Sequence, residues 1–178
     1  MKREPFSQTL QGGDHRSIGN SNRIAAHVLR HPRELPELIA CLWSDDPVVR
    51  MRAADAAEKI SVKRPNLLDP FKAALLGLAD EVTQAELRWH LALMLPRLTL
   101  DKLERARARA ALQRYLTDRS SIVKTWAMHG MAELSKGNPA LDSEMLDLLE
   151  RAFRTGTPAM RARSRKLIRH FQKRLEKI

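Results

Sequence analysis

The fold class is decided by residues 45–60, which read DDPVVRMRAADAAEKI. Apolar side chains recur along one helical face of this stretch, at Val49, Ala53, Ala56, Ala57 and Ile60. A spacing of three and four residues is typical of an amphipathic helix that buries one side. Asp46 directly before Pro47 adds the residue types that begin helices, a capping oxygen followed by proline at the first helical position. The stretch therefore predicts a capped, packed helix.

The composition of the whole chain supports an all-α fold. Of 178 residues, 43% are hydrophobic and 30% charged, which is too apolar for a disordered chain and too charged for a membrane protein. Aromatic residues make up only 4% and glycines number only 7, whereas sheet proteins favour aromatic and β-branched residues. The single cysteine, Cys41, lies among apolar neighbours; it excludes an intramolecular disulfide framework and indicates a buried thiol.

The helix at 48–60 recurs three times, at residues 86–98, 122–134 and 159–171. Basic residues mark equivalent positions in the four copies, at Arg50, Arg88, Lys124 and Arg161. The inward-facing columns match in the same register: Val49, Leu87, Val123 and Met160; Ala53, Leu91, Ala127 and Ser164; Ile60, Leu98, Leu134 and Phe171. Repetition of this kind is the signature of stacked structural units that share one core.

A second amphipathic stretch precedes each copy, at 36–44, 70–79, 101–117 and 142–154, so each unit is predicted to be a helical hairpin. The units span about 33–61, 65–98, 99–135 and 139–171. Asp69-Pro70 and Thr157-Pro158 repeat the helix-start chemistry, Asp101 with Glu104 resembles a capping box, and Pro96 should end its helix early. A further capped helix at 22–31 is expected to cover the first hairpin. Residues 1–22, which are polar and Gly-rich in part, are predicted to form a flexible tail.

On these motifs the chain resembles the HEAT-repeat family. The resemblance rests on Asp45-Asp46-Pro47-Val48-Val49-Arg50 with the apolar positions that follow, and more weakly on Asp118 through Lys124 and Leu134. It implies one domain over 23–178, a right-handed α-solenoid of about four HEAT-like hairpins with an N-terminal capping helix. The second helices would line the concave surface. Asp46 with Arg50, and Asp118 with Lys124, would bridge neighbouring repeats.

The positive charge is concentrated near the C-terminus. The chain has 32 Lys and Arg against 21 Asp and Glu, a net charge of +11. Residues 1–98 contribute 14 and 12, a net of +2, and residues 99–178 contribute 18 and 9, a net of +9. The predicted basic helix at 159–178 has one acid, Glu176. Its cations form the candidate anion- or nucleic-acid-binding site: Arg161, Arg163, Arg165, Lys166, Arg169, Lys173, Arg174 and Lys177.

The columns that face away from the core predict what a concave groove would offer to a partner. Its candidate partner-binding residues are mainly cationic and aromatic: Arg52, His90, Arg97, Trp126, His129, Arg163 and Lys166. Trp89 and Trp126 lie 37 residues apart and could stack a base or an extended side chain, or fill space between repeats. Trp43, at the end of a first helix, is expected in the core.

These observations predict a non-catalytic binding or scaffold module that recognises a protein partner, preferably an acidic one, on its concave face. The alternative is binding of nucleic-acid phosphates through the basic C-terminal helix with Arg52, Arg97 and Lys124. A third hypothesis comes from bacterial alkylpurine DNA glycosylases, which the chain resembles in architecture. Asp55 would be its acid, although an ordinary surface ion pair with Arg52 or Lys59 is the simpler role.

No catalytic residue, metal or cofactor is predicted. His27 and His31 have the spacing of two metal ligands but lack an evident third, and a helix ending in His-Pro explains them equally. No run of 18 apolar residues or signal-peptide pattern occurs, so the expected location is the cytoplasm.

Overall fold

The computed structural model describes residues 4–14 and 17–175, and helices dominate them, with no strand among these residues. This confirms the all-α class. The chain divides into two compact units, Met1–Thr99 (unit 1) and Leu100–Ile178 (unit 2). The sequence predicted a single domain over 23–178, whereas the structure places a boundary between the second and third predicted hairpins and adds the N-terminal residues to unit 1.

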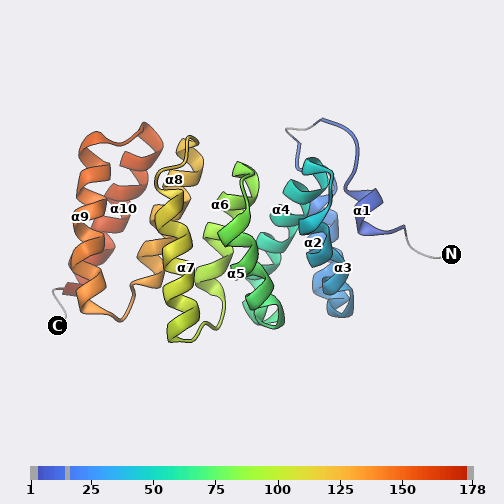
Figure 1. The fold of residues 1–178 in the computed structure, drawn as a ribbon, viewed down its shortest axis with the longest axis horizontal. Coiled ribbons are helices and arrows are strands. Elements are labelled where there is room, and N and C mark those ends of the chain that lie inside the picture. Colours follow the sequence, from blue (N-terminus) through green and yellow to red (C-terminus); the bar gives the residue numbers. More distant parts are fainter. Residues whose placement is uncertain (1–3, 15–16, 176–178) are drawn as a thin grey trace. The chain divides into compact units, whose positions relative to one another are not determined.

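Unit 1 is built around its longest helix, α4, which packs against α2 on one side and α6 on another (Figure 1). Its α-helices are α1 Phe6–Thr9, α2 Ser21–Arg30, α3 Leu35–Ala40, α4 Pro47–Lys63, α5 Lys72–Glu81 and α6 Ala85–Met94. Short 3-10 turns cover Pro32–Glu34, Cys41–Trp43, Pro65–Leu67, Asp69–Phe71 and Leu95–Arg97.

Unit 2 contains two long helical pairs. Its helices are α7 Lys102–Tyr115, α8 Ser121–Leu134, α9 Pro139–Thr155 and α10 Pro158–Leu175. Helix α8 contacts α7, α9 and α10, and α10 also packs along α9. Helix α8 is therefore the central helix of unit 2.

The local signals for helix ends hold at several positions. The Asp46 carboxylate accepts a hydrogen bond from the Val48 amide at the start of α4, and Asp101 with Glu104 forms the predicted capping box of α7. Helix α6 gives way to a 3-10 turn at Leu95–Arg97, as Pro96 predicts. These ends follow from local chemistry alone.

The expected start at Asp69-Pro70 is wrong in detail. These residues form a 3-10 turn, and the α-helix begins only at Lys72. The Asp69 carboxylate does not cap it; instead it accepts hydrogen bonds from the Thr99 amide and hydroxyl, both at 2.8 Å. A contact 30 residues away in the chain has replaced the local cap.

The inward columns of the repeat are buried except at Met160, which is half-buried. Val49, Leu87 and Val123 have no exposed surface, and the Ala53 and Ile60 columns are buried throughout. Cys41 is buried as expected, and burial, with a smaller effect from Glu37, raises the pKa of its thiol. Trp43 was placed wrongly in the core: its side chain is 48% exposed, because it lies at the end of a 3-10 turn rather than on a packed face.

The sequence predicted a flexible tail over 1–22, and the structure packs part of that segment. Phe6 and Leu10 are buried, and the Phe6 amide donates to the Glu37 carboxylate at 2.7 Å. Ser21 already belongs to α2. Polar, Gly-containing sequence suggested a tail, but two apolar residues and long-range hydrogen bonds fold the segment onto unit 1.

Among the described residues, no helix combines the length and the hydropathy that a bilayer span requires.

Candidate functional site

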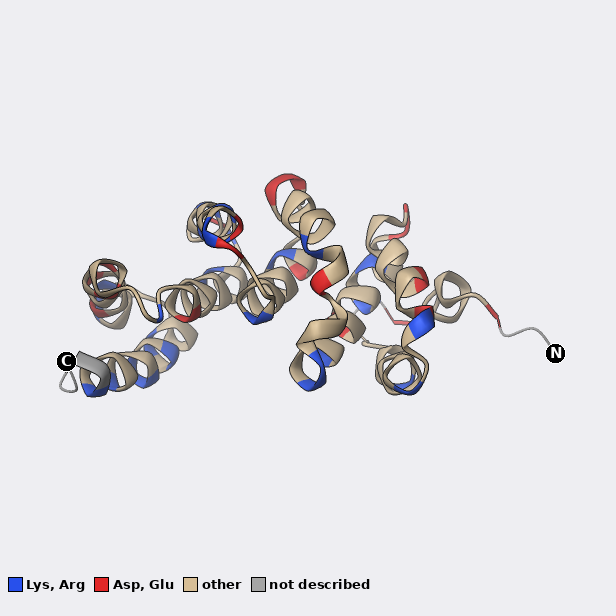
Figure 2. Ribbon diagram, turned by 90° about the horizontal axis from the view of Figure 1, so that it is seen from below, with Lys and Arg blue, Asp and Glu red and all other residues tan. Residues whose placement is uncertain are grey.

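Helix α10 separates its charged and apolar residues around its axis. Its inward side carries Ser164, Leu167 and Phe171, all buried. At 100° per residue, the cations from Arg161 to Lys173 cover the opposite side as a broad arc. In Figure 2 the ribbon that ends at the C mark is blue at intervals along its length. The helix therefore packs through one face and presents cations on the other.

The exposed cations of α10 have no carboxylate partner within the described part of the chain. They are Arg161, Arg165, Lys166, Arg169 and Lys173, which we call the α10 cation row. From Arg161 to Lys173 the row extends about 18 Å at the helical rise of 1.5 Å per residue. By contrast, Arg154 at the end of α9 pairs with Glu150 at 3.7 Å. The row offers charges that no described acid neutralises.

A cavity of about 230 Å³ lies beside the row, between α8 and α10. It is lined by Ile122, Thr125 and Trp126 from α8 and by Ala159, Ala162, Arg163 and Lys166 from α10. We call it the α8/α10 cavity. The structure thus brings together three residues of the predicted groove, Trp126, Arg163 and Lys166.

Two arginines of α10 lie over aromatic rings of neighbouring helices. The Arg163 guanidinium is 4.2 Å from the centre of the Trp126 ring, and the Arg165 guanidinium is 5.5 Å from that of Phe153 on α9. Cation–π contact holds such side chains in place without consuming their charge. Burial lowers the pKa of Arg163. Arg163 therefore acts as a positioned wall of the cavity, while Arg165 remains exposed in the row.

Three other residues of the predicted groove are occupied within unit 1. Arg52 is only 3% exposed, and its guanidinium contacts main-chain carbonyl oxygens of the N-terminal segment: Leu10 (2.7 Å), Gln11 (3.3 Å), Gly12 (2.6 Å), Asp14 (2.9 Å) and Ser17 (2.9 Å). His90 is 1% exposed. Arg97 donates to Glu58 at 2.6 Å and to Ser61 at 2.8 Å. Arg52 and His90 offer no surface to a partner, and Arg97 serves a contact within the unit.

The two tryptophans have different surroundings. Trp89 lies against His90, with 3.4 Å between ring centres, in unit 1. Trp126 lies in unit 2, with Arg163 over its ring and His129 meeting it edge-on at 5.7 Å. One face of the Trp126 ring already carries a guanidinium. Each tryptophan is engaged within its own unit.

Asp55 is buried rather than on the surface, and it binds both Ser21 and Lys59 through the same carboxylate oxygen. The ion pair with Lys59 confirms the simpler of the two sequence hypotheses for this residue, although not its surface location. Burial is the main reason that the pKa of nearby His90 is lowered to about 3. The charge of Asp55 raises this pKa by a smaller amount, and the charge of Lys59 lowers it. The hydrogen bond from Ser21 to Asp55 joins α2 to α4.

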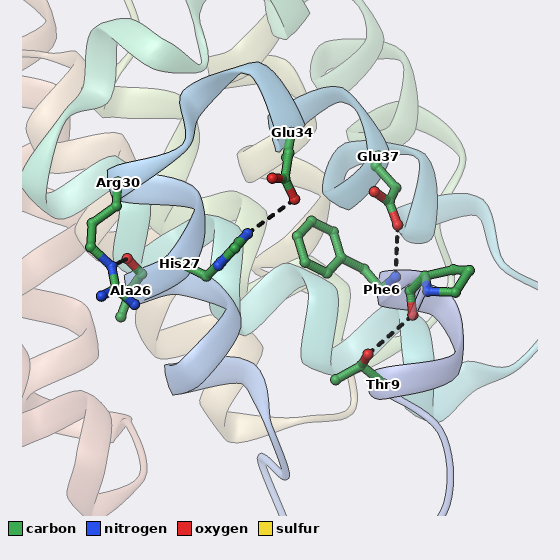
Figure 3. Close-up of polar contacts among 8 residues, drawn as sticks. Phe6, Thr9, Ala26, His27, Arg30, Glu34 and Glu37 are labelled. Atoms are coloured by element: carbon green, nitrogen blue, oxygen red, sulfur yellow. Dashed lines mark hydrogen bonds and ion pairs between the residues drawn. The ribbon is translucent and has the colours of Figure 1, made fainter. Parts of the chain in front are cut away.

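The N-terminal histidines are explained by local contacts. His27 Nε2 lies 3.0 Å from a carboxylate oxygen of Glu34 (Figure 3). The His27 ring also contacts that of His31, at 4.6 Å between centres. Phe6 packs edge-on against His27. The described residues contain no group of three ligating side chains of the kind that holds a metal ion. The histidines join α2 to the segments on either side of it.

Sequence reasoning missed the apolar lining of the α8/α10 cavity. Ile122 and Ala159 occupy one column of the repeat, and Thr125 and Ala162 the column three positions later. Ile122 is 53% exposed, so this position of α8 is not part of the core. The repeat alignment that placed Trp126 and Arg163 in one column also pairs these lining residues, so it could have predicted them. Of the predicted cations, Lys177 lies outside the described residues, and Arg174 is described only as part of the α10 backbone.

Comparison with protein families finds no match to this chain, and comparison with curated proteins finds no relative.

Proposed function

We propose that this protein is a non-catalytic binding module that recognises an acidic protein partner through helices α8 and α10. The observation that carries the proposal is the α10 cation row, which has exposed charges without carboxylate partners in the described residues, next to the α8/α10 cavity. Complementary charge speeds and orients association, and apolar contact adds affinity. A protein segment that carries acidic and apolar residues supplies both kinds of contact.

The repeat pattern gives this site its context. We infer that the four helical hairpins are HEAT-like repeats of a right-handed α-solenoid, in which second helices such as α8 and α10 contribute to the partner-facing surface. Support comes from the equivalent columns that line the cavity and from Arg50, which donates to Gln84 at 2.8 Å and so links the first two hairpins.

The direct test is to measure binding of labelled poly-L-glutamate to the full chain by fluorescence anisotropy, at increasing salt concentrations. We expect saturable binding at low salt that weakens as salt screens the charges. Absence of binding at low salt would contradict the proposal.

A second candidate ligand is duplex nucleic acid, because the length and charge of the row also suit a phosphate backbone. Neutralising about four phosphates would give a slope near −4 in a plot of log affinity against log salt concentration. Generic duplex DNA is the probe for this candidate. Binding of DNA with such a slope, together with failure of poly-L-glutamate, would favour it over the acidic protein.

A further inference from the structure

We propose that the partner segment inserts an apolar side chain into the α8/α10 cavity and places carboxylates on either side of it. This inference rests on the proposed function and specifies the partner: an acidic segment interrupted by a residue such as leucine, rather than a uniform run of acids.

The shape and lining of the cavity support an apolar occupant. Its volume of about 230 Å³ equals several water molecules at roughly 30 Å³ each, enough for one large side chain. Ile122, Ala159 and Ala162 are all exposed there, and the alanines leave α10 without bulk at this point. Single exposed apolar residues are ordinary, but apolar residues grouped in a hollow are typical of a binding site.

The charges around the cavity determine what must flank that side chain. Arg163 forms one wall, held over Trp126, and Lys166 lies three residues along the same helix. Arg165 and Arg169 of the cation row follow on the exposed side of α10. A carboxylate on either side of the inserted residue would meet a cation, and a basic flank would be repelled.

A phosphate backbone matches this site less well. It has no apolar group for the hollow, and one face of the Trp126 ring, which an unpaired base would otherwise stack on, already carries Arg163 at 4.2 Å. Of the two candidate ligands, the cavity therefore suits an acidic protein segment better than duplex nucleic acid.

The test uses three labelled twelve-residue peptides and the full chain. The first is Glu- and Asp-rich with one central leucine, the second replaces that leucine with alanine, and the third keeps the leucine but replaces every acid with its amide. We expect the alanine peptide to bind about tenfold more weakly than the first, the loss that follows from one buried leucine, and the amide peptide not to bind.

A variant of the protein tests whether the preference arises in this cavity. Ala162→Leu fills the hollow from an exposed helical position and leaves every charge in place. We expect it to bind the leucine and alanine peptides equally well. Its matched control is Ala110→Leu, at an exposed position of α7, which should retain the tenfold preference.

The possible results separate the inference from the proposed function. Equal binding of the leucine and alanine peptides by the unmodified protein overturns the inference and leaves charge-based recognition standing. A tenfold preference that persists in Ala162→Leu also overturns it, because the apolar residue would then bind elsewhere. Failure of both acidic peptides, with binding of duplex DNA, overturns both proposals.

Discussion

Arg52 holds the N-terminal segment in place by contacting five main-chain carbonyl oxygens with one buried guanidinium. Arg52→Ala would leave these acceptors and their segment without a partner, and buried polar groups are costly when unpaired. We expect the free energy of unfolding to fall by about 2–4 kcal/mol in chemical denaturation. Arg23→Ala, at an exposed site of α2, is the control and should change it by less than about 0.5 kcal/mol. Equal stability of the two variants would refute this role.

His90 should make stability depend on pH. Its pKa is about 3 in the folded protein and about 6.5 in an unfolded chain, so between these values only the unfolded state binds the proton. The stabilisation from the neutral ring is complete above pH 6.5 and is lost as pH falls toward 3. From pH 7.5 to 5.5 we expect it to lower the free energy of unfolding by about 1.4 kcal/mol. His90→Gln should remove this dependence and exposed His170→Gln should not; parallel profiles for all three proteins would contradict it.

At the scale of elements, Gly156 permits the two-residue connection between α9 and α10. A Cβ at this position would lie 2.3 Å from the Ala152 carbonyl oxygen and 2.9 Å from Met160 Cβ. The backbone would have to shift, so Gly156→Ala should lower the free energy of unfolding by about 1–3 kcal/mol, measured by chemical denaturation. Thr155→Ala, one residue earlier and exposed, is the control. An unchanged midpoint for Gly156→Ala would show that the turn adapts freely.

The helices were predictable where local chemistry decides them. Asp46 and the Asp101 capping box begin helices as expected, and Pro96 ends one, because each acts within a single turn of the chain. The predicted helix start at Asp69 was wrong because the Asp69 carboxylate binds Thr99, a tertiary contact that no local pattern encodes. The packing of the N-terminal segment could not be predicted for the same reason, since its hydrogen-bond partner Arg52 lies far along the sequence.

At the scale of the whole chain, the repeat alignment predicted which residues share a face but not what covers that face. Arg52, His90, Trp126 and Arg163 occupy one column. In unit 1 the first two are buried, Arg52 beneath the N-terminal segment, whereas in unit 2 the last two line an open cavity. Half of the predicted column therefore serves packing. The candidate site could be predicted only for the unit in which nothing described covers the column.

The location of positive charge, rather than its total, should govern binding of anions. Reversing Arg161, Arg165, Arg169 and Lys173 to Glu changes the composition from 32 basic and 21 acidic residues to 28 and 25, a net charge of +3. Reversing four exposed cations of unit 1 gives the same net charge: Arg23, Arg33, Lys63 and Arg64. We expect the first variant to lose binding of poly-L-glutamate, because the unpaired row is removed, and the second to retain most of it, because the α10 cation row stays intact. Circular dichroism of both variants checks that the helices remain. Equal weakening of the two would mean that net charge, and not the surface of α10, attracts the ligand.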